Sequence, residues 1–301
     1  MPPETNFSSL LDYDSVEAYL QQLFFLSKSQ LKKSELSKKF LQKAVHRKDQ
    51  LQIPLDLANN LEINPKYLGK KIEIIFKDDQ VAIFNKPYNL HSHPLNYTGQ
   101  DNCLSFFRKG GRNLGVNLNI NKLNYGRGLL YRLDYGTSGV MFYINDEGLL
   151  HNLRENFSKL VKKKSYLAIV SGEVRGDGAI ESYFKYIGSK DSKAELLSKN
   201  NYLGGDFPLG KLEYVVRNYN SSEKVSLLEV SLITGLRHQI RAQLASIGHP
   251  ILGDTLYGGK EAARIFLHAY KYEVEIGEKK YVGKSLDAEL FSRFFDLDCG
   301  L

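Results

Sequence analysis

Short apolar runs of strand length dominate the chain from residue 71 onward, and they constrain the fold more than any other feature. These runs occupy residues 71–76, 81–85, 129–133, 140–144, 166–170, 212–216, 225–233 and 265–274. Helical spacing of apolar residues is convincing only at 147–160 and 237–247 in this part. Strands that outnumber helices in this way predict an α+β domain built on a largely antiparallel mixed sheet. The stretch from Gly188 to Gly210 has no sustained apolar period, so we expect an irregular connection there.

The N-terminal segment differs in charge and pattern. Asp14 and Glu17 form a capping box, and apolar residues at helical spacing follow, so a helix is predicted over 14–26. A second helical stretch, over 28–48, holds one acid, Glu35, among many bases. The bases are Lys28, Lys32, Lys33, Lys38, Lys39, Lys43, Arg47 and Lys48. Such a run is commonly a solvated helix face, and RNA contact is the alternative.

These differences predict two domains and a polyanionic partner. We expect a small N-terminal α/β module over residues 1–75 and a larger domain over 76–301, joined near the polar turn at 77–80. The excess of 41 Lys and Arg over 34 Asp and Glu favours polyanions, although charge alone is weak support. With only Cys103 and Cys299, no disulfide framework or thiolate metal site is expected. No leader and no apolar run near the ~20 residues of a membrane span are recognisable, which predicts a cytoplasmic protein away from membranes.

Asp134 is the first candidate for chemistry. It lies where the apolar run 129–133 meets a turn of small and polar residues, before the run 140–144 begins. We expect a strand to deliver this carboxylate into the turn, where glycine lets the backbone approach a ligand closely. The structural alternative is a hairpin turn in which the aspartate bonds its own backbone, as lone turn aspartates commonly do.

Arg241 is the second candidate, on the predicted helix that begins at Arg237. Ile240, Leu244 and Ile247 give this helix an apolar stripe, and Arg241 stands at its edge. A guanidinium partly buried there needs an anionic partner, because an unpaired charge in a low dielectric is costly. That partner serves either structure or function.

Two other segments carry aromatic or imidazole groups. Tyr166 is the first aromatic residue of a strand that follows Lys162–Lys164, and buried strand tyrosines are usually core residues. His91 and His93 form a His-x-His pair, but no third ligand stands at a recognisable spacing. No metal site is therefore predicted.

Taken in order, these segments resemble the RluA-type RNA pseudouridine synthases. Residues 131–134 with 137–139 are similar to the family signature around its catalytic aspartate, and 164–172 to its tyrosine strand. The other matching segments are Asn85–Pro87, His93–Pro94, Gly235, His238–Arg241, Gly248–Ile251, Gly253–Asp254, Tyr257–Gly258 and Leu267–Ala269. The resemblance covers roughly residues 75–275.

Some positions depart from the family pattern. The signature usually has His where Tyr131 stands, and Arg-Thr where Leu236 and Arg237 stand. Both departures are expected to alter RNA contacts. The N-terminal segment is similar to the alpha-L RNA-binding module of a ribosomal small-subunit protein, with 26–31 as part of its helix pair and 68–72 as its closing strand.

The resemblance implies isomerisation of uridine to pseudouridine within RNA, on the pseudouridine synthase fold. One glycosidic bond is exchanged for a carbon–carbon bond, so no cofactor is expected. Asp134 is implied to be the catalytic carboxylate, as nucleophile at the anomeric carbon or as base at the neighbouring carbon. Arg241 is implied to pair with it and favour its charged form. Tyr166 is implied to stack on the uracil and to handle a proton.

The implied partner is ribosomal or transfer RNA, without an obligate protein partner. Arg132 is expected to fill the space that an extruded uridine leaves. Lys86, Arg237, Lys32 and Lys33 are expected to contact the RNA, mostly through its phosphates.

Two other functions stay open at this stage. One is a catalytically silent RNA-binding assembly factor on the same fold, against which Asp134, Tyr166 and Arg241 argue. The other is a hydrolase of nucleosides, which would release free base. A single candidate carboxylate and the basic N-terminal segment fit that hydrolase poorly.

Overall fold

The computed structural model describes residues 4–9, 11–24, 26, 28–54, 57, 63, 66–95, 100–121, 124–186, 193–197, 206–287 and 291–295. The N-terminal elements are β1 (Glu4–Ser8), α1 (Val16–Phe24), α2 (Lys28–Lys33), α3 (Lys38–Leu41) and β2 (Gln50–Pro54). The other elements are β3 (Glu73–Lys77), β4 (Val81–Lys86), α5 (Cys103–Gly110), η1 (Arg112–Leu114), β5 (Ser138–Ile144), α6 (Glu147–Glu155), α7 (Phe157–Leu160), β6 (Val161–Ser171), β7 (Gly178–Tyr186), β8 (Ala194–Leu197), β9 (Leu209–Asn220), β10 (Val225–Leu232), α8 (Gln239–Ser246), η3 (Thr255–Tyr257), β11 (Leu267–Ile276) and β12 (Lys279–Lys284).

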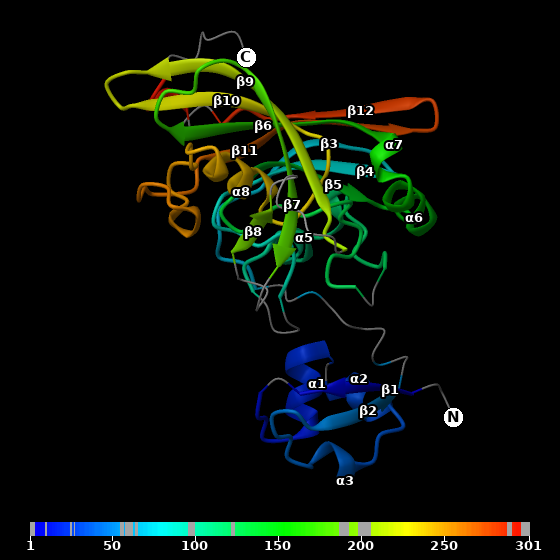
Figure 1. The fold of residues 1–301 in the computed structure, drawn as a ribbon. Coiled ribbons are helices and arrows are strands. Elements are labelled where there is room, and N and C mark those ends of the chain that lie inside the picture. The colour runs from blue at the N-terminus through cyan, green and yellow to red at the C-terminus, as the bar shows by residue number, and fades with distance from the viewer. Residues whose placement is uncertain are drawn as a thin grey trace.

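One large sheet organises the C-terminal part of the chain (Figure 1). Its ten strands follow the order β3-β4-β5-β11-β6-β10-β9-β7-β8, and β12 pairs with β11. The pair β5–β11 is parallel, while the other pairs are antiparallel. The predicted fold class, an α+β domain on a largely antiparallel mixed sheet, is therefore confirmed. Every residue of β5 is buried, as expected for a continuous apolar strand near the centre of a covered sheet.

The register of the central strands brings distant segments together. On β11, His268 and Ala269 lie opposite Ser138 and Gly139 of β5, and Ala269 also lies opposite Tyr166 of β6. Gly139 has φ +121°, and a Cβ there would lie 2.3 Å from the carbonyl oxygen of Ala269. Only glycine permits this approach. The turn before β5 is thus held two strands away from Tyr166.

The N-terminal segment has its own two-stranded sheet, β1–β2, and its own hydrophobic cluster (blue in Figure 1). This cluster contains Phe7, Tyr13, Val16, Tyr19, Leu20, Leu23, Phe24, Leu26, Leu31, Val45, Leu51, Ile53 and Leu57. Tyr67 and Ile72 pack instead into the cluster of the large sheet, which begins at Ile63. We propose that the boundary between two modules lies between Leu57 and Ile63, earlier than the expected position near residue 75.

The predicted strand at 129–133 is wrong. Within it, only Leu129 forms a bridge, to Tyr143, and the rest of the segment is irregular. Leu129, Leu130 and Leu133 are nevertheless buried. The apolar residues of this segment therefore indicate that it is buried against β5. The segment lacks the hydrogen-bonded ladder that defines a strand.

Other predicted elements need smaller corrections. The helical stretch at 28–48 contains two short helices, because Ser37 caps a new helix by accepting from the backbone N–H of Phe40. The expected closing strand at 68–72 is irregular. The connection predicted at 188–210 includes β8, which pairs with β7, and the start of β9, whereas 188–192 and 198–205 lie outside the described residues.

Two helices also differ in detail from the prediction. The predicted helix at 147–160 is divided at Asn156 into α6 and α7. Ile247 is 38% exposed at the end of α8, so the buried stripe contains Ile240 and Leu244 without it. Within the described part of the chain, no helix combines the length and the apolar character needed to cross a membrane.

Candidate active site

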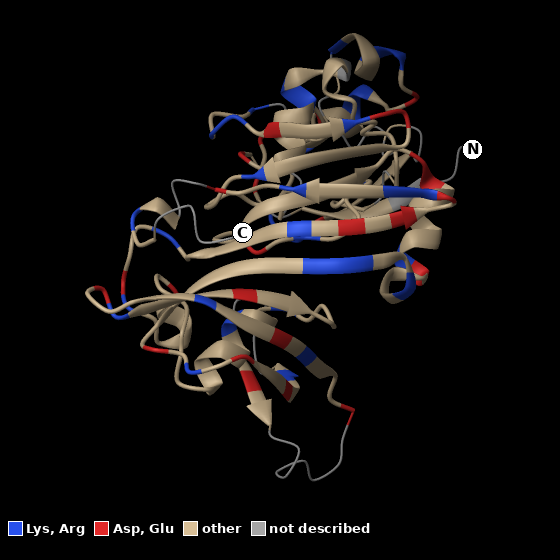
Figure 2. Ribbon diagram, turned by 90° about the horizontal axis from the view of Figure 1, so that it is seen from above, with Lys and Arg blue, Asp and Glu red and all other residues tan. Residues whose placement is uncertain are grey.

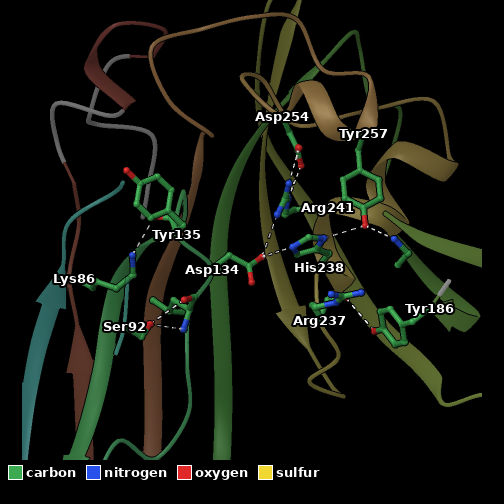
Figure 3. Close-up of polar contacts among 12 residues, drawn as sticks. Lys86, Ser92, Asp134, Tyr135, Tyr186, Arg237, His238, Arg241, Asp254 and Tyr257 are labelled. Atoms are coloured by element: carbon green, nitrogen blue, oxygen red, sulfur yellow. Dashed lines mark hydrogen bonds and ion pairs between the residues drawn. The ribbon is translucent and has the colours of Figure 1, made fainter. Parts of the chain in front are cut away.

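Asp134 projects from a turn that is held on both sides (Figure 3). The hydroxyl of Ser92 donates to the carbonyl of Leu133 at 2.9 Å and accepts from its N–H at 3.1 Å. The Nζ of Lys86 donates to the carbonyl of Tyr135 at 3.4 Å. The backbone on either side of Asp134 is thereby fixed, while 32% of its side chain stays exposed.

Arg241 lies between two carboxylates (Figure 3). Its Nε and Nη2 donate to Asp254 at 2.6 and 2.8 Å, and its Nη1 donates to Oδ2 of Asp134 at 3.4 Å. Burial opposes the charged form, but the hydrogen bonds and charge of Asp254, followed by the charge of Asp134, outweigh burial and raise the pKa of Arg241. The guanidinium thus stays charged and directs one N–H toward Asp134.

Asp254 is held in place by glycine. Gly253 before it has φ +82°, and a Cβ at Gly253 would lie 1.8 Å from the carbonyl oxygen of Arg264. This closeness requires glycine. The Asp254 side chain is 1% exposed. Sequence reasoning assigned no role to Asp254, although the need of Arg241 for an anionic partner was a signal for it.

His238 is a second residue of the site to which the sequence assigned no role, although it lies in the matching segment His238–Arg241. Its Nε2 lies 3.9 Å from Oδ2 of Asp134, and its Nδ1 lies 3.2 Å from the hydroxyl of Tyr257. That hydroxyl accepts from the backbone N–H of Ala194 at 2.8 Å. Burial lowers the pKa of His238 and outweighs the opposing charge of Asp134. Burial thus favours the neutral form of the ring.

Tyr166 belongs to the core as well as to the neighbourhood of Asp134. It is 6% exposed, and its hydroxyl is hydrogen-bonded to the hydroxyl of Tyr272. Burial raises the pKa of Tyr166, the bond to Tyr272 acts against this rise, and the charge of Asp134 adds to it. The structure thus places Tyr166 within electrostatic reach of Asp134, with its hydroxyl next to Tyr272.

Arg132 and Arg237 are both at least partly exposed. Arg132 is exposed, and its Nη1 lies 3.0 Å from Nε2 of His93. The Arg237 guanidinium lies 4.7 Å from the ring centre of Tyr186, whose hydroxyl donates to the Arg237 carbonyl at 3.1 Å (Figure 3). Both remain candidates for RNA contact.

Lys86 is not available to RNA, and its predicted phosphate contact is wrong. The side chain is fully buried, and its Nζ donates to the carbonyls of Pro87 at 3.0 Å, Leu90 at 2.7 Å and Tyr135 at 3.4 Å. Burial lowers its pKa to about 8. Its charge is solvated by backbone dipoles, so Lys86 supports the Asp134 turn from within.

Basic residues elsewhere divide into paired and unpaired groups. Figure 2 shows blue and red segments side by side on strands of the large sheet. Examples are the pairs Lys162–Glu275 at 3.0 Å and Lys279–Asp78 at 2.7 Å. Lys32 and Lys33 of α2 are exposed, and neither has an ion-pair partner among the described residues. Both remain candidates for contact with RNA phosphates.

Comparison with known proteins places the chain in one family. The family model described as RNA pseudouridylate synthase matches residues 80–246. Ribosomal large subunit pseudouridine synthase D of Borreliella burgdorferi is 29% identical over 84% of this chain and 76% of its own length. Uncharacterized RNA pseudouridine synthase YhcT of Bacillus subtilis is 31% identical over 76% of this chain and 72% of its own length.

A solved structure supports the same fold. Human RNA Pseudouridylate Synthase Domain Containing 1 aligns with a TM-score of 0.59 at 18% identity, over 73% of this chain and 86% of its own. The matched range 80–246 contains Asp134, Tyr166 and Arg241, so the resemblance seen in the motifs is confirmed. The chain belongs to the RNA pseudouridylate synthase family, with RluA-type motifs, and is an RNA pseudouridine synthase.

Proposed function

We propose that the chain converts uridine to pseudouridine within ribosomal RNA, with Asp134 as the catalytic carboxylate. One observation carries the assignment of this residue. Of the two carboxylates that bind Arg241, Asp254 is 1% exposed and takes two of its hydrogen bonds, whereas Asp134 is 32% exposed and takes one. Asp134 is therefore the carboxylate that a substrate can reach.

The contacts of Asp134 suit an anion that acts on the ribose. Arg241 and His238 both approach its Oδ2, at 3.4 and 3.9 Å, and we propose that Oδ1 faces the substrate. A guanidinium that donates a hydrogen bond to a carboxylate fixes its orientation. Asp134 can then act at C1′ as nucleophile or at C2′ as base.

The second carboxylate argues against a hydrolase. Glycosidases use two carboxyl groups on the two sides of the scissile bond, one of which activates water or protonates the leaving group. Asp254 cannot take that part, because it is buried and engaged by Arg241 at 2.6 and 2.8 Å. Of the two carboxylates that contact Arg241, only Asp134 is accessible, which fits a reaction in which the detached base is the acceptor.

The surrounding residues suit retention of the base and binding of RNA. We propose that the ring of Tyr166 holds the detached uracil near the sugar, where proximity replaces diffusion. Arg132 is exposed next to Asp134 and suits the space vacated by an extruded uridine. Arg237, Lys32 and Lys33 supply positive charge for the phosphates.

Ribosomal RNA is the proposed substrate because of one relative. The Borreliella burgdorferi protein is named for the ribosomal large subunit, and its similarity extends over 84% of this chain. Transfer RNA is the alternative that the test must separate. RNA from cells that lack the gene is incubated with purified protein, and pseudouridines are then mapped in both RNA classes. New pseudouridine in transfer RNA alone would overturn the ribosomal assignment.

The same assay tests the catalytic carboxylate. Asp134→Asn removes the anion but keeps the side-chain shape, so we expect rates to fall by a factor of roughly 1000 or more, while RNA affinity changes little. Asp79→Asn is the matched control, because Asp79 is exposed in the turn between β3 and β4. An Asp134→Asn rate within about tenfold of the Asp79→Asn rate contradicts the proposal, since a tenfold change is only about 1.4 kcal/mol.

A further inference from the structure

Three tyrosines meet behind Asp134, and they come from separate segments of the chain. The ring of Tyr131 stacks on Tyr272, with centroids 4.4 Å apart and planes 14° apart. Tyr272 meets Tyr166 edge to face at 5.9 Å, and their hydroxyls are hydrogen-bonded. The Tyr131 hydroxyl donates to the Val140 carbonyl at 3.0 Å, so it does not compete for the hydroxyl of Tyr272.

Either hydroxyl can donate in the bond between them. Both residues are buried, Tyr272 at 2% and Tyr166 at 6% exposure, so whichever oxygen accepts keeps a hydrogen without an acceptor among the described residues. With Tyr272 as the donor, that hydrogen lies on Tyr166, where a bound uracil can accept it.

The Tyr166 side of the pair is the one that faces the reaction. The charge of Asp134 acts on Tyr166, and Tyr166 lies opposite Ala269, which itself lies opposite Gly139 beside the Asp134 turn. We propose that Tyr272 is a positioning residue that donates its hydroxyl hydrogen to Tyr166, so that Tyr166 can carry a proton between two atoms of the uracil. The inference rests on the proposed function.

The chemistry of the isomerisation requires such a carrier. The bond from N1 to C1′ breaks and a bond from C5 to C1′ forms, after which C5 must lose a proton and N1 must gain one. Tyr166 can balance both changes: its O–H bond breaks as N1–H forms, and the phenolate then takes the proton from C5. Donation by Tyr272 stabilises this phenolate, because a hydrogen bond to a charged acceptor is about twice as strong as a neutral one.

Burial raises the pKa of both Tyr166 and Tyr272. A hydrogen bond from Tyr272 would offset part of the cost of a phenolate on Tyr166. Stacking of Tyr131 keeps the donor ring in place.

The test compares two variants that each lack one buried tyrosine hydroxyl. Tyr272→Phe removes the proposed donor, whereas Tyr143→Phe removes a hydroxyl that donates to the Asn117 carbonyl at 2.9 Å, away from Tyr166. Single-turnover rates are measured on ribosomal RNA transcribed with uridine or with uridine deuterated at C5. We expect Tyr272→Phe to be slower by roughly 10- to 100-fold and to show a new isotope effect, and Tyr143→Phe to show neither.

A double variant provides the second readout. If Tyr272 acts only through Tyr166, adding Tyr272→Phe to Tyr166→Phe brings no further decrease in rate. A further decrease equal to that of the single variant, or an unchanged isotope effect in Tyr272→Phe, overturns the inference. The isotope effect is a ratio on one protein sample, so partial misfolding cannot imitate it. Asp134→Asn is assayed in parallel: if it keeps the rate of Asp79→Asn, the proposed function itself fails.

Discussion

Arg241 and Asp254 form a bidentate ion pair, 2.6 Å from Nε to Oδ2 and 2.8 Å from Nη2 to Oδ1. This pair fixes the plane of the guanidinium and leaves Nη1 pointing toward Asp134 at 3.4 Å. The two carboxylates thus have different roles. Asp254 holds the arginine in place, and Asp134 is the accessible carboxylate to which the arginine donates.

Asp254→Asn is expected to destabilise the fold far more than Asp134→Asn. Removing one partner of a buried pair leaves an uncompensated charge and costs about 3–5 kcal/mol, and here both groups are less than a tenth exposed. Asp134 is 32% exposed and its bond to Arg241 is long, so its replacement is expected to cost less than about 1 kcal/mol. Urea unfolding of the two variants measures both values, and equal destabilisation would contradict the division of parts.

Replacement of Tyr166 separates stacking from proton transfer. Phe keeps the aromatic face without the hydroxyl, whereas Leu has neither, so both variants are expected to be slow and Leu the slower. The additional decrease in Leu should correspond to base stacking, worth roughly 1–3 kcal/mol. Single-turnover rates with saturating enzyme exclude effects of weakened affinity. Parental rates in both variants would make Tyr166 a core residue without a part in the reaction.

Much of the fold was predictable because its signals are local. Tyr166 lies in a continuous apolar run that forms a buried strand, and Arg241 lies in a short helix between the buried Ile240 and Leu244, so each element could be predicted from its own segment. The segment 129–133 was wrongly predicted as a strand because its leucines are buried, while only Leu129 forms a bridge. Its sequence, Leu-Leu-Tyr-Arg-Leu, contains no β-branched residue, and this composition was the signal against a strand.

The site was less predictable because its contacts join segments that are far apart in the sequence, and no local pattern of apolar residues connects them. Asp254 contacts Arg241 from the loop after α8. Tyr272 contacts Tyr166 from a neighbouring strand, although the two residues are 106 positions apart in the sequence. Lys86 shows the opposite error. Its charge suggested exposure to RNA, yet three backbone carbonyls make its burial tolerable. Such compensation depends on the folded backbone and leaves no trace in composition.

His268 is expected to make the fold sensitive to acid. The Ser138 hydroxyl lies 2.8 Å from its Nδ1 and the Ser285 carbonyl 2.8 Å from its Nε2, an arrangement that suits a neutral ring. Burial lowers its pKa from 6.5 to about 4. A lowered pKa contributes stability that is present above pH 6.5 and disappears as the pH falls toward 4.

Between pH 7 and pH 5, protonation of this histidine in the unfolded chain should lower the free energy of unfolding by about 2 kcal/mol. His268→Gln is expected to flatten the dependence of the unfolding free energy on pH in this window. His151→Gln is the control, because His151 is exposed on α6 and 74% of its side chain contacts solvent. Urea unfolding at half-unit steps of pH provides the curves. Parallel curves for the parent and His268→Gln would show that another group governs the acid response.

Lys32 and Lys33 are expected to strengthen RNA binding through phosphates, without any part in catalysis. Both are exposed on α2, in a segment whose described acids are few, and each phosphate that a lysine neutralises releases counterions. Replacing both with Gln should weaken RNA affinity and reduce the slope of log affinity against log salt by about 0.7–0.9 for each phosphate that is no longer neutralised. The double variant Arg175→Gln with Lys224→Gln removes the same charge from exposed positions after β6 and between β9 and β10. Single-turnover rates at saturating RNA should stay at the parental value in both. A salt slope equal to that of the control variant would mean that the α2 lysines form only a solvated face.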